Sequence, residues 1–155
     1  MAKLTKKDIL KSIREARSSH VQWVDYAKAL VNGLDITKEQ IPLEVTTCEF
    51  GKWLYSDGHI LLSIFKEEVI EKLESKHKAL HDSYLKIFKI YFNPSKLSFW
   101  DRILKRQKRI SATQEHLAIQ YFIQLEKISF ELISFLNLIE KKISSIDEKS
   151  FDKFL

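Results

Sequence analysis

The sequence predicts an all-α protein, specifically an antiparallel four-helix bundle with a short second helix. The chain of 155 residues has only three glycines and two prolines, so few residues break helices or form tight turns. Apolar residues also recur in alternating steps of three and four, the period of an amphipathic helix. We therefore expect no sheet and a single domain over residues 1–155, with its core at about 9–143 and a polar tail at 144–155.

The first predicted helix begins near Ile9 and carries His20 on its apolar face. His20 occupies the one place in the apolar stripe that an apolar residue does not fill. Asn32 and Gly33 supply a stop signal, and residues 34–46 are expected to connect this helix to the next. The stripe consists of Ile13, Ala16, Trp23, Ala27, Leu30 and Leu34.

A short second helix is expected to carry Cys48 in its first turn. Thr46 followed three residues later by Glu49 matches a capping box, which predicts a helix start at Thr46 or Thr47. The sequence Ser56-Asp57-Gly58 is expected to end the helix. Unsatisfied amides and the positive end of the helix dipole lower the pKa of a thiol in a first turn. We therefore expect Cys48 to be prepared for a metal ion or an oxidant.

Two longer helices complete the predicted bundle. The third runs from about Ile60 to Phe92, and His77 fills a gap in its apolar stripe. The fourth follows a basic stretch, and the tail beyond Ile143 is polar and expected to fray. The third stripe comprises Ile70, Leu73, Leu80, Tyr84, Ile87 and Tyr91, and the fourth comprises Leu117, Tyr121, Leu125, Ile128, Leu132, Phe135 and Ile139.

The formal net charge of +5 is moderate, and much of the local excess lies in one stretch. Such a stretch can attract phosphates or an acidic protein surface, but we favour the interpretation that it keeps a helix face or linker solvated. No apolar run approaches the roughly 20 residues that span a bilayer, and nothing resembles a signal peptide. We therefore expect a cytoplasmic protein. The basic residues are Arg102, Lys105, Arg106, Lys108 and Arg109.

Four residues of the predicted helices are candidate ligands of one metal ion. His77 and His81 are four residues apart, so their imidazoles lie on one helix face. His20 lies on an inward stripe, where an imidazole needs a partner, and Cys48 is the single cysteine, so it cannot form an internal disulfide. Three imidazoles and one thiolate suit tetrahedral Zn²⁺. The alternative is four separate polar residues, each with its own hydrogen bond inside the bundle.

The sequence around the cysteine resembles a known family. The run Cys48-Glu49-Phe50-Gly51-Lys52-Trp53-Leu54 is similar to the Cys-x-Leu/Phe-Gly-Lys-Trp signature of the bacterial chemoreceptor zinc-binding (CZB) domain family. A His with a Trp three residues later, His20 and Trp23, precedes this signature, and the pair His77 and His81 follows it. The resemblance implies a four-helix fold, a 3His/1Cys zinc site and a homodimer. The sequence departs from the family pattern at Val45, where the family often has Arg, and in a long basic insertion after Phe92.

Residues near the proposed ligands have structural interpretations as well. Gly51 allows close backbone approach to a neighbouring helix, and Trp53 is expected to pack in the core or in a dimer interface. Lys52 either faces solvent or helps to hold the thiolate in its charged form. Asp25 and Asp82 are candidate partners for imidazole N–H groups, although surface positions are favoured for both. Aromatic residues that could supply a dimer interface are Trp53, Trp100, Phe122, Phe130 and Phe135.

The predicted site favours a regulatory protein over an enzyme. Four protein ligands leave no open position on zinc for water or substrate, and the sequence has no Gly-rich phosphate loop or His-Glu-x-x-His motif. A di-iron bundle is disfavoured because only one Glu-x-x-His sequence, Glu74 to His77, is present. The resemblance implies a sensory domain of bacterial signalling, of the chemotaxis or cyclic-di-GMP type, that acts on a separate signalling protein. It would sense zinc availability or, through a redox-reactive Cys48, oxidants.

The second hypothesis is a binding module in which zinc is only a structural staple. In this hypothesis the basic segment 102–109 contacts nucleic acid or an acidic protein partner. We favour it less, because such runs usually lie on solvated surfaces.

Overall fold

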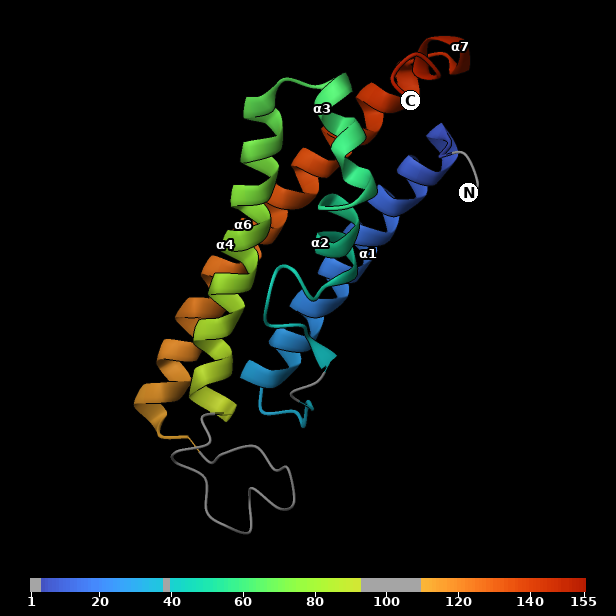
Figure 1. Cartoon of the computed structure of the whole chain (residues 1–155). Coiled ribbons are helices and arrows are strands. Elements are labelled where there is room, and N and C mark those ends of the chain that lie inside the picture. The colour runs from blue at the N-terminus through green and yellow to red at the C-terminus, as the bar shows by residue number, and fades with distance from the viewer. Residues whose placement is uncertain (1–3, 38–39, 93–109) are drawn as a thin grey trace.

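The computed structural model describes residues 4–37, 40–92 and 110–155, and all regular structure within them is helical (Figure 1). Three long helices form the frame: α1 (Lys6–Val31), α4 (Glu67–Phe92) and α6 (Ala112–Ser145). Helix α6 packs against both α1 and α4. The shorter elements are α2 (Glu49–Leu54), the 3-10 helix η2 (Asp57–His59), α3 (Ile60–Ile64) and α7 (Glu148–Phe151). The predicted all-α class is therefore confirmed.

The elements alternate in direction, as an antiparallel bundle requires. In Figure 1, α1 and α4 run the same way, whereas α6 and the ascending segment of α2 and α3 run the opposite way. The second arm of the bundle is therefore built from two short helices, and α2 contacts α1. The expectation of a short second helix that brings a cysteine to the bundle is confirmed, because Cys48 is the N-cap residue of α2.

Helix α1 begins at Lys6, earlier than the predicted start near Ile9, and it ends at the predicted stop signal. Thr5 and Asp8 form a capping box at its start. Asn32 is the C-cap residue, and Gly33 follows with φ of 80°, a left-handed conformation that glycine adopts without steric cost. Leu34 lies beyond this stop and is exposed rather than part of the buried stripe.

The predicted third helix is two helices, which corrects the expectation of one helix from Ile60 to Phe92. Phe65 is extended, and α3 ends before it while α4 begins at Glu67. Leu61 and Ile70 are both buried. Nine residues are about 2.5 turns of helix, so an unbroken helix would turn these two side chains to opposite faces. The break lets both side chains reach the core.

The buried face of α6 is broader than the predicted stripe. Leu125, Leu132 and Ile139 are buried as expected. Four further buried positions lie one residue after predicted ones, since α6 faces two helices, and Ile143 extends the buried face beyond the predicted stripe. The four are Ala118, Phe122, Ser129 and Leu136. Predicted positions that are only partly buried or exposed are Leu117, Tyr121, Ile128 and Phe135.

The C-terminal segment differs from the expected frayed tail. Residues 148–151 form α7, and Phe151 is 1% exposed and joins the hydrophobic core. Lys6 at the start of α1 donates hydrogen bonds to the carbonyl oxygens of Ser144 and Ile146, at 3.2 and 2.5 Å. The end of α6 is thereby tied to the beginning of α1.

Two predictions concern residues outside those that the structure describes. These are the role of the basic segment 102–109 and the placement of Trp100. Within the described residues, no helix is long and apolar enough to cross a membrane.

Candidate metal centre

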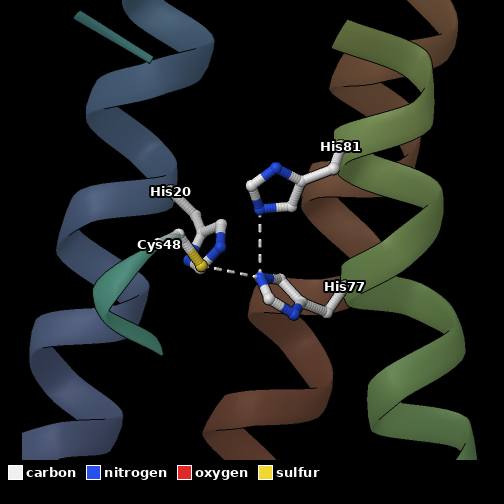
Figure 2. Close-up of side chains that lie close together, drawn as sticks. All are labelled: His20, Cys48, His77 and His81. Carbon is white, nitrogen blue, oxygen red and sulfur yellow. Dashed lines mark hydrogen bonds between the residues drawn. The ribbon is translucent and has the colours of Figure 1, made fainter. Parts of the chain in front are cut away.

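The four predicted ligand residues lie together between α1 and α4 (Figure 2). His20 extends from the middle of α1, His77 and His81 extend from successive turns of α4, and Cys48 caps the N-terminus of α2. All four residues are at most 4% exposed. Three segments far apart in the sequence therefore meet at one buried point.

The spacing of the four candidate ligand atoms fits a tetrahedral zinc ion. Cys48 Sγ lies 3.2 Å from His77 Nε2, and His77 Nε2 lies 3.1 Å from His81 Nε2. One ligand atom from each of the four residues lies within 4.8 Å of the others. Bonds of about 2.0 Å to nitrogen and about 2.3 Å to sulfur at tetrahedral angles place ligand atoms about 3.3 to 3.6 Å apart. Small adjustments of these side chains would therefore complete the coordination shell.

The second ring nitrogens of two histidines are bonded to backbone carbonyl oxygens. His20 Nδ1 donates to Ala16 O at 2.5 Å, and His81 Nδ1 donates to Pro42 O at 3.0 Å. With the proton on Nδ1, the lone pair of each Nε2 is directed at the centre of the cluster. Carbonyl groups therefore have the role that was considered for Asp25 and Asp82, which are both exposed.

His20 Nε2 supports a metal ion over four independent polar residues. This atom is buried and has no hydrogen-bond partner. A buried polar atom without a partner costs free energy comparable to a lost hydrogen bond. A zinc ion bound to this lone pair would remove the cost, whereas the alternative of separate, satisfied polar residues leaves it in place.

Burial sets the protonation of the cluster. It lowers the pKa of His20 to about 4 and that of His77 to about 3, because the low-dielectric surroundings disfavour an imidazolium ion. The pKa of His81 is lowered for the same reason. All three imidazoles are thus neutral at physiological pH, which is the form that binds a metal ion.

The thiol of Cys48 differs from its prediction in two ways. The helix begins at Glu49 rather than at Thr46 or Thr47, so the sulfur itself caps the helix and accepts a hydrogen bond from the Gly51 amide at 3.2 Å. Burial raises the pKa of this thiol, and the desolvation outweighs the amides of Gly51 and Phe50. The expected lowering is therefore wrong for the metal-free protein, in which Cys48 is a thiol.

Aromatic rings enclose the cluster. The centroid of the Trp23 ring lies 4.5 Å from the centroid of the His20 ring and 5.5 Å from that of the His81 ring. The centroid of the Phe50 ring lies 4.9 Å from that of the His77 ring, and the Phe50 ring stacks on Trp53. The three imidazoles are therefore in direct contact with aromatic rings.

The remaining candidates lie away from the cluster. Lys52 is exposed and pairs with Glu49 at 2.6 Å, and its charge also acts to lower the pKa of Cys48, although burial outweighs this effect. His59 and His116 are exposed. Within the described residues, the one group suited to a metal ion contains no carboxylate, which argues against a di-iron centre. Sequence reasoning missed the carbonyl oxygens of Ala16 and Pro42, since a backbone acceptor leaves no residue-type signal.

The fold and the site define a class, a helical bundle with a buried cluster of three histidines and one cysteine that fits Zn²⁺. Comparison with protein families gives the same result, because the family model described as the chemoreceptor zinc-binding domain (CZB) matches residues 20–88. Those residues include all four members of the cluster. Residues 20–88 are therefore similar to the CZB domain family, and Zn²⁺ is the cofactor that the cluster fits. Searches of curated proteins and of solved structures each found no match.

The matched family and the ligand set of the cluster both describe a zinc site that is saturated by protein ligands. CZB is a zinc-binding signalling domain. A zinc ion with four protein ligands keeps no position for a substrate or a nucleophilic water, in contrast to catalytic zinc sites with three protein ligands.

Proposed function

We propose that this protein is a sensory module of bacterial signalling, of the chemotaxis or cyclic-di-GMP type, whose zinc ion is bound by His20, Cys48, His77 and His81. The observation that carries the proposal is the convergence of these four side chains, with the buried and unpartnered Nε2 of His20 among them. Zinc would join α1, α2 and α4 at one point. A change at the metal would then alter how the short helix α2 is held.

Two signals can act through these residues, and we favour an oxidant. In the absence of metal, burial keeps Cys48 protonated, so only the zinc-bound form presents a thiolate. Hypochlorous acid can take two electrons from this sulfur, which becomes a sulfenic acid while chloride leaves. Sulfenic acid is a weaker zinc ligand than thiolate. Its formation would release α2 from the metal.

The test is zinc release by hypochlorous acid, followed with a zinc-specific dye. Cys48 is the single cysteine, so mass spectrometry of its peptide reports the modification without ambiguity. We expect release to parallel Cys48 oxidation in the wild type and to be absent from zinc-loaded Cys48→Ala. Equal release from both proteins would refute the thiol switch. Partial occupancy of the wild type in the free-zinc range of a cell would instead favour zinc sensing.

We further propose that the protein is a homodimer that uses α6. Several apolar side chains of α6 are exposed, and Phe130 is 74% exposed. Of the other aromatic residues considered for an interface, Phe122 is buried and Phe135 packs against the core. The exposed apolar residues of α6 are Leu117, Ile119, Ile123, Phe130 and Leu138.

Light scattering measures the mass that decides this proposal. We expect Phe130→Glu to be monomeric with unchanged zinc content, while Tyr55→Glu, at another exposed aromatic residue, stays dimeric. A monomeric wild type would refute the dimer.

We also propose that the protein is cytoplasmic, where a thiol stays reduced, that it forms one domain, and that it acts on a separate signalling protein.

A further inference from the structure

Gly51 occupies a position in α2 where no side chain fits. A Cβ atom built on Gly51 would lie 1.6 Å from the carbonyl oxygen of Val45 and 2.8 Å from its carbonyl carbon. The backbone of Gly51 is ordinary right-handed helix, so the residue is not needed for an unusual φ angle. Glycine costs about 1 kcal/mol in a helix relative to alanine. The lack of space for a side chain beside Val45 therefore explains why residue 51 is a glycine.

The contact closes the turn that presents Cys48. Thr47 N–H donates to Glu44 O at 3.1 Å within this turn. The Cys48 thiol donates to Val45 O at 3.3 Å, and its sulfur accepts from Gly51 N–H at 3.2 Å. The carbonyl of Val45, the sulfur and the backbone of Gly51 thus form one compact unit. The position of the sulfur depends on how closely Val45 approaches α2.

The size of the clash can be compared with the tolerance of a zinc site. Real Cβ contacts essentially never fall below 3.0 Å, so a side chain at residue 51 would force the Val45 carbonyl and the first turn of α2 apart by at least 3.0 − 1.6 = 1.4 Å. Ligand distances in zinc sites vary by only about 0.2 Å. A shift of this size in the turn would take Cys48 Sγ out of bonding range. The three histidines extend from α1 and α4 and would stay in place.

We propose that Gly51 is a positioning residue for the Cys48 zinc ligand, because its missing side chain allows the Val45 carbonyl to pack against the first turn of α2. The inference rests on the proposed function, in which Cys48 binds zinc. It predicts that Gly51→Ala acts on the metal through Cys48 and through no other ligand.

Cobalt substitution and zinc affinity test this role. In Gly51→Ala we expect loss of the sulfur-to-cobalt charge-transfer band while cobalt still binds to the histidines. Zinc affinity should fall about a hundredfold to a thousandfold, the share of one ligand in four. Gly58→Ala is the matched control, because a Cβ there would lie 3.1 Å from Trp53 O, a contact that small shifts relieve. It should keep the band and the affinity.

Combination with Cys48→Ala separates positioning from general destabilisation. If Gly51 acts through the sulfur, Gly51→Ala leaves zinc affinity unchanged in the Cys48→Ala background. An equal loss in both backgrounds, a retained charge-transfer band, or failure of metal-free Gly51→Ala to fold where Cys48→Ala folds would each overturn the inference. Unchanged zinc affinity in Cys48→Ala alone would instead overturn the proposed ligand set.

Discussion

Zinc affinity should rise about tenfold per pH unit between about pH 7 and pH 8. Zinc binds neutral imidazoles and a thiolate. Burial lowers the pKa of His20 to about 4 and that of His77 to about 3, and it lowers the pKa of His81 from its usual value, so these rings are neutral at and above about pH 7. Burial raises the pKa of Cys48, so its thiol still carries the proton that zinc binding must displace. One proton is therefore released per zinc, which corresponds to about 1.4 kcal/mol per pH unit.

The assay is competition with a chelator of known, proton-corrected affinity at several pH values. The logarithm of the zinc affinity of the wild type should rise with pH with a slope near one. The slope for Cys48→Ala should be near zero, because no thiol is left to ionise. A flat wild-type profile would show that Cys48 is ionised before zinc binds or does not bind it. A slope of two or more would mean that a histidine is protonated in the metal-free protein.

Three further predictions separate the site from the scaffold. His77→Ala should weaken zinc binding about a hundredfold to a thousandfold, and the exposed His59→Ala should leave it unchanged; isothermal titration compares them. Glu140→Gln removes the ion pairs that join α1 to α6 and should cost about 1 kcal/mol in urea unfolding of the metal-free protein without changing zinc affinity. Leu132→Ala, at a fully buried position of α6, should cost about 2 to 5 kcal/mol, and a loss below 1 kcal/mol would contradict the assigned core.

The clustering of the candidate ligands was accessible to sequence reasoning because His20 and His77 each fill a gap in an apolar stripe. A polar residue at an inward position must find a partner, and this constraint is local to each helix. His20, His77 and the turn-related His81 all follow from the helical period. The structure places them together with Cys48.

The details that the sequence did not predict depend on contacts between distant elements. The break at Phe65 arises because Leu61 and Ile70 must reach the same core. The direction of the pKa shift at Cys48 depends on burial by neighbouring elements, whereas helix-dipole reasoning includes only local amides. The burial of Phe151 requires the start of α1 and the end of α6 to be adjacent, and the polar composition around it gives no sign of that.

The distribution of the four ligands along the chain sets an order in which the metal site can assemble during folding. His77 and His81 are one helical turn apart, so α4 can capture zinc with two imidazoles as soon as that helix forms. Cys48 is 29 residues from His77, and its arrival must close a loop at the expense of chain entropy. His20, on α1, would join last. In zinc-containing solution, folding should therefore pass through a species with zinc on α4 alone, and zinc should accelerate the steps that dock α2 and α1.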